Sequence, residues 1–278
     1  MSTENALLTI LVEKIHNDTL VLPTLPAVAL KVRKAADNPD INLSAMADVV
    51  SQDPSLSARL VKIANSAYLG RSVKVTSIQQ AVTRIGLRQI KNIATALAME
   101  QLFVSKNDIV KGYMSRIWVD TIDIVASSMA VLQIHTNQTK NRALNLDSMM
   151  LAALIHNIGV LPILTEAERH ADVFANPTFL DVALEKLAGK IGTSIMIEWG
   201  FEPEFVDITQ NCKDLSVTSD TVSYLDLVRV ASALCGKFNN HEEEIFKGAV
   251  DIGLIDDLSA LLSDEFNELC DNAKQIFL

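Results

Sequence analysis

Two adjacent polar residues, His156 and Asn157, are the best candidates for chemistry in this 278-residue sequence. They end a strongly apolar stretch, Met149–Ile155, and precede Gly159. This position predicts that both side chains lie near the core rather than in open solvent. An imidazole can bind a metal ion or carry a proton, and an amide can both donate and accept hydrogen bonds. The pair either lines a polar pocket or consists of two buried polar residues that satisfy the end of a helix.

Other reactive residue types lack a recognisable arrangement. The cysteines, Cys212, Cys235 and Cys270, match neither a zinc-binding spacing nor a redox pair. We therefore expect free thiols, and an odd number of scattered cysteines is typical of a reduced, cytoplasmic protein. The sequence has no phosphate-binding loop, no dinucleotide-binding glycine motif and no serine nucleophile elbow. The corresponding nucleotide-binding and serine-hydrolase chemistries are excluded.

Helices must position these residues, because apolar residues recur at helical spacing along almost the whole chain. With 10 glycines and 7 prolines, the sequence has few of the turns that β-sandwiches and barrels need. Asp53-Pro54 is a strong helix start, and overlapping capping boxes begin at Thr76 and Ser77. Gly86 is expected to end the helix that follows. The predicted fold class is all-α.

The predicted helices are short in the first part of the chain and longer in the second. They cover about 26–38, 54–65, 77–86, 87–103, 108–135 and 147–156, start again at 203, and end with two or three helices between 219 and 277. Asp147 or Ser148 is expected to cap the helix that carries His156. Asn65 and Ser66 are expected to bond the backbone where their helix ends.

The charge balance limits the partners. Lysine and arginine number 24 against 34 acidic residues, and the net charge of −10 argues against binding to nucleic acid or to an anionic membrane. The N-terminus lacks the features of a signal peptide. The longest apolar stretch, Met149–Leu164, is shorter than the ~18–20 residues that a spanning helix needs. We expect a soluble protein.

The charge is also unevenly distributed. Residues 1–110 carry 12 basic and 9 acidic side chains (12 − 9 = +3), whereas residues 111–278 carry 12 and 25 (12 − 25 = −13). Arg84, Arg88 and Lys91 share one helix face. We interpret this face as solvated, with a patch for an anion or a protein partner as the alternative.

Four ordered motifs resemble the HDOD domain, a module related to the HD phosphohydrolases. They are Leu22–Pro26 (LPTLP), Asp53-Pro54, Leu60–Ser66 (LVKIANS) and Ser77–Gly86 (SIQQAVTRIG). Residues 20–104 resemble the first half of that domain, and residues 111–235 resemble the HD half. The resemblance implies a multi-helical HD-like bundle. In it, residues 1–107 form an N-terminal lobe of short helices, and residues 108–278 form a degenerate HD-like lobe with C-terminal helices.

The resemblance also allows the metal-ligand positions of the HD enzymes to be checked one by one. These enzymes hold one or two metal ions with a His, a His-Asp pair and a further Asp. Here His156 occupies the His position of the pair and Asn157 the Asp position. An amide oxygen is a much poorer ligand for a catalytic cation than a carboxylate. The remaining positions fall on Asp120, on Ala188, near Cys212-Lys213-Asp214, where the family often has a histidine pair, and on Ser232.

The resemblance therefore implies a degenerate site, without catalytic residues, bound metal or cofactor. Asp120, His156 and Asn157 are the residues of a remnant polar pocket. A weak metal site made of Asp120, Asp123 and His156 is the alternative. If Asp120 approaches His156, its charge favours the imidazolium while burial opposes it.

At the level of function, the resemblance implies a non-catalytic bacterial regulatory protein of signal transduction. Such a protein acts in the cytoplasm through contacts with proteins of its pathway, with neither nucleic acid nor membrane as a partner. The alternative is a metal-dependent phosphohydrolase of the HD superfamily with an altered ligand set. Two or more missing ligands remove most of the metal-binding energy and the charge that activates water. This loss favours the regulatory protein.

Overall fold

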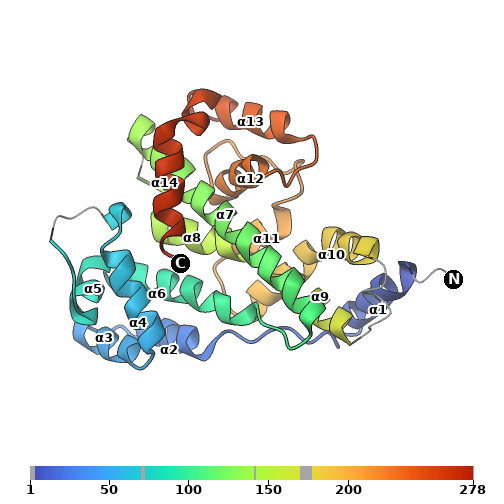
Figure 1. The fold of residues 1–278 in the computed structure, drawn as a ribbon, viewed down its shortest axis with the longest axis horizontal. Coiled ribbons are helices and arrows are strands. Elements are labelled where there is room, and N and C mark those ends of the chain that lie inside the picture. Colours follow the sequence, from blue (N-terminus) through green and yellow to red (C-terminus); the bar gives the residue numbers. More distant parts are fainter. Residues whose placement is uncertain (1–3, 70–72, 141, 170–176, 278) are drawn as a thin grey trace. The chain divides into compact units, whose positions relative to one another are not determined.

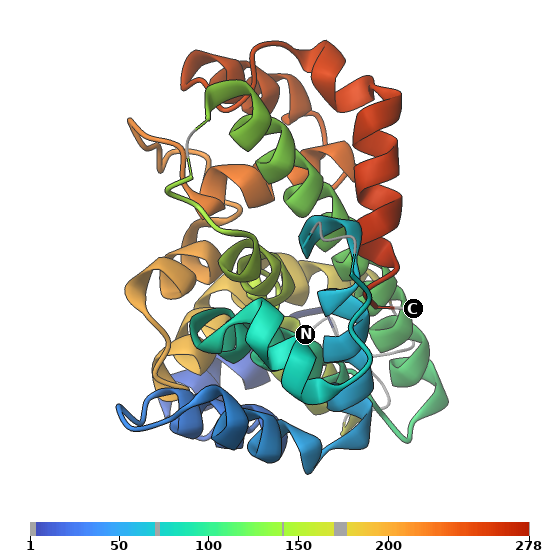
Figure 2. The same cartoon turned by 90° about the vertical axis from the view of Figure 1, so that its left-hand side faces the viewer.

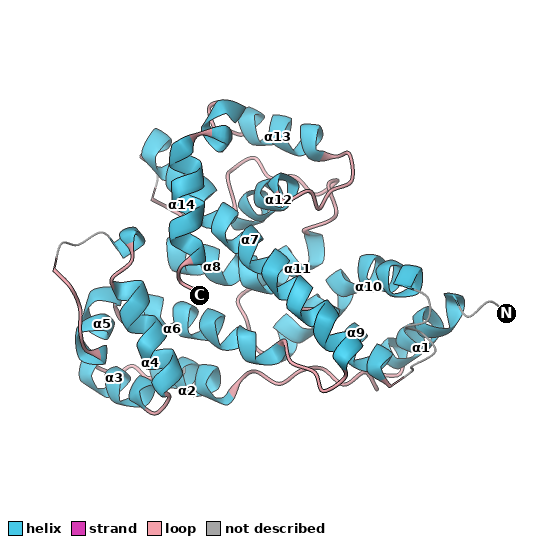
Figure 3. Ribbon diagram, in the orientation of Figure 1, coloured by secondary structure: helices cyan, strands magenta, loops and turns pink. Residues whose placement is uncertain are grey.

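In a computed structural model, residues 4–69, 73–140, 142–169 and 177–277 of the protein are described. All regular structure within these residues is helical (Figure 3). The prediction of an all-α fold is therefore confirmed. The helices in chain order are α1 (Glu4–His16), α2 (Ala27–Ala36), α3 (Leu43–Ser51), α4 (Pro54–Ala64), α5 (Ile78–Ile85), α6 (Leu87–Ala98), α7 (Asp108–Thr139), α8 (Leu146–Ile155), α9 (Val160–Glu168), α10 (Pro177–Glu198), α11 (Pro203–Asn211), α12 (Tyr224–Leu234), α13 (Glu242–Asp251) and α14 (Asp264–Lys274), with short 3₁₀ helices η1 (Ala67–Leu69), η2 (Met99–Leu102) and η4 (Leu258–Leu262) (Figure 1).

The chain forms two compact units, and each is assembled from three separate stretches. Unit 1 comprises Met1–Thr24, Leu102–Thr121 and Ile155–Thr218, and unit 2 comprises Leu25–Gln101, Ile122–Leu154 and Ser219–Leu278. The long helix α7 contributes residues to both. This division reflects compactness of the chain and does not test the two family lobes, so the boundary at 107/108 stays a prediction.

Local start signals place the short helices where the sequence predicts them. The carboxylate of Asp53 accepts a hydrogen bond from the backbone N–H of Leu56 at 2.9 Å, and Pro54 occupies the first turn of α4. The hydroxyl of Ser77 accepts one from the backbone N–H of Gln80 at 3.2 Å and caps α5. Each cap satisfies an N–H that has no partner within its own helix.

The capping box of α5 differs in one respect from the predicted form. The side chain of Gln80 accepts from the backbone N–H of Thr76 at 2.9 Å, one residue before the cap. At the other end, α5 stops at Gly86, whose φ of 94° and ψ of 154° are essentially confined to glycine. Helix α6 begins at the next residue, so the predicted end of a helix at Gly86 is confirmed.

Asn65 and Arg84 fix the backbone that follows α4 in unit 2. The amide of Asn65 accepts from the N–H of Val75 at 2.7 Å and donates to its carbonyl at 2.8 Å. Arg84 donates to the carbonyls of Ala64 at 3.0 Å and Val73 at 2.5 Å. The predicted backbone role of Asn65 is confirmed. Arg84 binds backbone carbonyls instead of forming part of a solvated face.

Helix α8 begins one residue earlier than a cap at Asp147 or Ser148 requires. Its first residue is Leu146, so both polar residues lie in the first turn. Their side chains bind Asn92 of α6, whose amide donates to Asp147 Oδ2 at 2.9 Å and to Ser148 Oγ at 3.1 Å. Asn92, which is distant in sequence, thus binds both side chains. The expectation that Asp147 or Ser148 is the N-cap of α8 is wrong.

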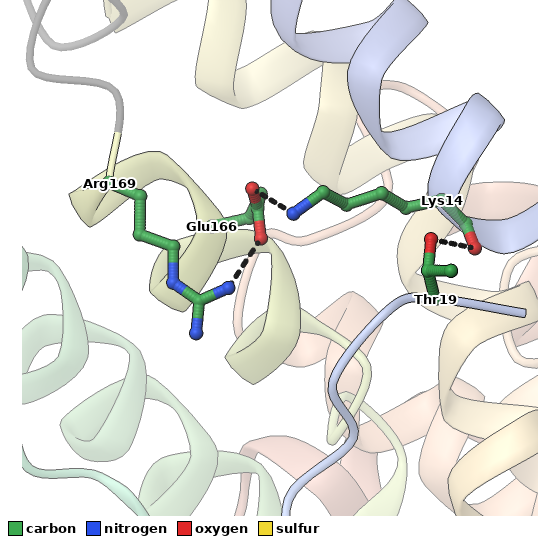
Figure 4. A network of polar contacts seen from close by, with 4 residues as sticks. All are labelled: Lys14, Thr19, Glu166 and Arg169. Atoms are coloured by element: carbon green, nitrogen blue, oxygen red, sulfur yellow. Dashed lines mark hydrogen bonds and ion pairs between the residues drawn. The ribbon is translucent and has the colours of Figure 1, made fainter.

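In unit 1, α10 packs against α9, α11 and α1. A polar network ties α1 to α9 (Figure 4). Lys14 Nζ lies 2.5 Å from one carboxylate oxygen of Glu166, and Arg169 Nη1 lies 3.2 Å from the other. The Glu166 side chain is 3% exposed, so its charge depends on these cations. Further along the chain, the Trp199 indole donates to the carbonyl of Pro23 at 3.0 Å.

Two stretches of the described chain are long and apolar enough to cross a membrane by length and composition. They are Asp108–Thr139 and Leu146–Glu168. Their most apolar windows are 61% and 83% buried within the structure. Such burial is typical of core helices in soluble proteins, and it agrees with the expectation of a soluble chain.

Candidate functional site

His156 and Asn157 lie in the tight turn that joins α8 to α9. The turn is built by backbone hydrogen bonds from Ile158 to the Ile155 carbonyl at 3.0 Å and from Val160 to the Asn157 carbonyl at 3.2 Å. Ile155 and Ile158 are fully buried, whereas the two polar residues are half-buried. The polar pair therefore sits at the edge of the core, with its apolar neighbours inside.

Gly159 presses this turn against the backbone of α10. A Cβ atom at Gly159 would overlap the carbonyl oxygen of Ala188, and it would lie 2.8 Å from the Ala188 carbonyl carbon and 2.5 Å from the Gly192 nitrogen. On the other side of the same contact, a Cβ at Gly192 would lie 3.2 Å from Thr209 Cβ of α11. Backbone atoms cannot move aside as side chains do. Only a glycine fits at position 159.

This contact places the backbone of Ala188, one of the expected ligand positions, against the turn that carries two others, His156 and Asn157. Ala188, one position inferred from the family pattern, touches the turn that carries His156 and Asn157. Its methyl group offers no lone pair to a metal ion. The contact is made by the backbone carbonyl of Ala188, and this residue type has no side-chain donor for a metal ion.

The two aspartates of α7, Asp120 and Asp123, belong to different units and differ in their contacts. Asp120 is half-buried and belongs to unit 1, as do His156 and Asn157. Asp123 belongs to unit 2, where its carboxylate forms an ion pair with Lys274 of α14 at 2.7 Å (Figure 2, α14 in red). The ion pair occupies Asp123, which weakens the alternative of a metal site made of Asp120, Asp123 and His156.

Ser232, the last expected ligand position, lies on α12 in unit 2. Its residue is 3% exposed, and its hydroxyl oxygen has no hydrogen-bond partner within the described part of the chain. A hydroxyl can replace neither the charge nor the affinity of a carboxylate.

The donors at Asp120, His156, Asn157, Ala188 and Ser232 do not fit the metal centre of an HD enzyme. They supply one imidazole, one carboxylate, one amide, one methyl group and one hydroxyl. Across the residues that the structure describes, no group of three or more His, Cys, Asp and Glu side chains has an arrangement that could hold a metal ion. A catalytic metal needs several charged donors to lower the pKa of its water. The remnant pocket of Asp120, His156 and Asn157 stays a prediction.

Sequence reasoning missed a second polar group, which lies in unit 2. Ser127 Oγ lies 3.8 Å from Cys235 Sγ, and Ser127 and Cys235 are both close enough to Cys270 to influence the pKa of its thiol. Burial raises the pKa of the Cys235 thiol, and it raises that of Cys270 to about 11. Both cysteines are free, as expected, and their raised pKa values keep them protonated near neutral pH. No local spacing signals the group, because Ser127 and Cys235 are 108 positions apart in the sequence.

Comparisons with known proteins agree with the sequence motifs. The HDOD domain model matches residues 22–215. A protein of Shewanella amazonensis SB2B, provisionally named a metal-dependent phosphohydrolase, is 40% identical, with both chains covered completely and a TM-score of 0.94.

Two more distant proteins are also similar. A protein of Marinobacter aquaeolei VT8, provisionally named a signal transduction protein, is 19% identical with a TM-score of 0.61, over 99% of this chain and 64% of that one. An uncharacterized protein of Treponema pallidum is 27% identical over 189 residues, which are 64% of this chain. The chain spans about a third of that relative, 35% of its length.

Proposed function

Because this chain belongs to the HDOD domain family, we propose that it is a non-catalytic regulatory protein of bacterial signal transduction. It acts in the cytoplasm through contacts with proteins of its pathway. The Marinobacter protein with the same kind of fold, provisionally named a signal transduction protein, supports the pathway part of this proposal.

One observation carries the non-catalytic part: the ligand positions of the HD centre hold residues that cannot do its work. Asn157 is neutral where the family motif has a carboxylate, and Ala188 has no donor although it touches the same turn. A metal-activated water needs the cation's charge and a firmly held cation. With His156 and Asp120 as the remaining strong donors, neither requirement is met.

The second candidate function is metal-dependent phosphoester hydrolysis. The name of the Shewanella protein favours it, because that protein is 40% identical over the whole chain. In that case His156 and Asp120 would hold the metal ion, which would supply the nucleophilic water. The two functions differ in metal content and in turnover, so one set of measurements separates them.

The test is elemental analysis of protein purified without chelator, together with a phosphodiesterase and nucleotidase screen in added Mn²⁺. We expect far less than one equivalent of Fe, Mn or Zn and no turnover above the buffer blank. His156→Ala is compared with His16→Ala, which removes an exposed histidine of α1. About one metal equivalent, with hydrolysis that disappears in a folded H156A and persists in H16A, would overturn the proposal.

A further inference from the structure

Unit 2 exposes two leucines at the ends of the short helix η4. Leu262 is 78% exposed and Leu258 is 43% exposed. Leu261, which lies between them, is 3% exposed and holds η4 against the core. Helix η4 also packs against α14. The exposed leucines therefore sit on an ordered support, about 8 Å apart along η4 at ~2.0 Å per residue.

Carboxylates flank these leucines on both sides in the sequence. Residues 248–273 contain seven acidic residues, all of them exposed, and neither lysine nor arginine. Four of the carboxylates lie within three residues of an exposed leucine, namely Asp256, Asp257, Asp264 and Glu265. Among the described residues, no cation forms an ion pair with any of these four. Lys274, the next cation along the chain, is paired with Asp123.

Local structure explains the carboxylates but not the leucines. Asp257 caps η4 by accepting a hydrogen bond from the backbone N–H of Ser259 at 2.6 Å. Asp264 and Glu265 lie in the first turn of α14, where the helix dipole favours negative charge. Leu262 remains in water in the folded protein, so its apolar side chain contributes little to folding. Exposed apolar residues with a polar rim are typical of surfaces that a protein partner covers.

We propose that η4 is a docking surface for a protein segment that carries both apolar and basic side chains. Leu258 and Leu262 would contact the apolar side chains, and the four flanking carboxylates would attract the lysines or arginines. We call these six residues the acidic leucine surface. Opposite charges at the rim of an interface steer the partner and reject proteins of the wrong charge. The same negative charge repels nucleic acids and anionic membranes.

This inference deepens the proposed function, and it rests on the part of that proposal in which the protein acts through contacts with other proteins. It does not rest on the absence of catalysis. Metal content and turnover test that absence in separate measurements. A failure of the docking surface is therefore distinguishable from a failure of the non-catalytic proposal.

The experiment uses a helix-forming peptide with two leucines four positions apart and two lysines at each end. The comparison peptide has glutamates in place of the lysines. The full chain, labelled with ¹³C at its leucine methyl groups, is titrated with each peptide. We expect the signals of Leu258 and Leu262 to shift saturably with the lysine peptide only, while that of Leu151, buried in unit 2, stays in place. Added NaCl should weaken the binding, because salt screens exposed charges.

Two variants test the two components of the surface. Leu262→Gln should weaken binding of the lysine peptide by at least about fivefold, because apolar contact is lost. Its matched control is Ile197→Gln, at a site of α10 in unit 1 that is 63% exposed. Asp264→Lys combined with Glu265→Lys should weaken binding by roughly tenfold, because attraction becomes repulsion at two positions. The control with the same change in net charge is Asp181→Lys combined with Glu185→Lys, at exposed positions of α10.

Three results would each overturn the proposal: no saturable shift of Leu258 and Leu262 at millimolar peptide, equal affinity for the two peptides, or equal losses in the variants and their controls. Shifts of the same leucine signals that follow the protein concentration without any peptide would show that a second copy of the chain covers the surface. That result would overturn the choice of partner.

Discussion

Replacing Gly159 by alanine is the most direct perturbation of the contact between α10 and the turn that carries His156. The new Cβ would overlap the Ala188 carbonyl oxygen and lie 2.5 Å from the Gly192 nitrogen. Ordinary contacts of a Cβ atom are 3.4–4 Å. The turn and α10 must therefore move apart, since neither partner atom belongs to a side chain.

The cost follows from the packing that this separation disrupts. Adding one methyl group to a well-packed core costs about 1–3 kcal/mol and occasionally more. Here the clash involves backbone on both sides, and the buried residues Ile158 and Ile191 lose contacts as the helices part. We expect Gly159→Ala to lower the free energy of unfolding by at least about 3 kcal/mol. For a chain of this size that corresponds to roughly 6–12 °C in Tm.

Gly112→Ala is the matched control, because it makes the same change in the exposed part of α7. A Cβ at Gly112 would meet nothing within 4 Å. Alanine is the better helix former by up to about 1 kcal/mol, so this variant should melt slightly above the parent. Thermal melts and urea titrations followed by circular dichroism measure both variants. If G159A unfolded at the same temperature and urea midpoint as the parent, the steric reasoning would be refuted.

Two further predictions concern buried charge and buried thiol. Lys14→Ala removes one of the cations that compensate the buried Glu166 carboxylate and should lower the free energy of unfolding by about 1–3 kcal/mol in urea titrations. Arg169→Ala removes a half-exposed cation and should lower it by less than about 1 kcal/mol. Equal losses in the two variants would contradict the greater importance of Lys14. Because the pKa of Cys270 is raised in the folded protein, the thiol loses its proton at a lower pH in the unfolded chain than in the folded one. The free energy of unfolding should therefore fall as the pH rises from about 9 to about 11. The expected decrease is about 1–2 kcal/mol, after allowance for solvent near the thiol. Cys270→Ala should flatten this pH dependence in urea titrations at pH 8, 9.5 and 11, and an unchanged slope would show that other groups cause it.

Local signals predict much of the helical pattern. Asp53-Pro54, Ser77 and Gly86 act within one helical turn, so their caps and breaks are encoded by residues next to one another. The start of α11 at Pro203 follows the same logic. Periodicity then assigns the fold class, because nearly every stretch shows helical spacing.

Contacts between distant segments could not be predicted in this way. The binding of Asp147 to Asn92 joins residues 55 positions apart, and it displaced the cap expected at α8. The sequence shows Gly159 shortly after His156 and Asn157, but the backbone contact of Gly159 with Ala188 depends on how α10 packs. The replacement of metal ligands could be predicted from the sequence, because the family pattern specifies which positions hold ligands.

The assembly of each unit from three stretches affects how the protein folds as it is made. Residues 25–101 are synthesised first among the parts of unit 2, but the stretch that completes the unit, residues 219–278, is synthesised last. At about 5–20 residues per second, translation of the intervening chain takes on the order of ten seconds or more. During that time η1 lacks its packing against α14, and the Tyr68 hydroxyl lacks the Leu269 carbonyl to which it donates at 2.6 Å. Truncation before α14 should therefore loosen η1, although η1 lies some 200 residues earlier in the chain.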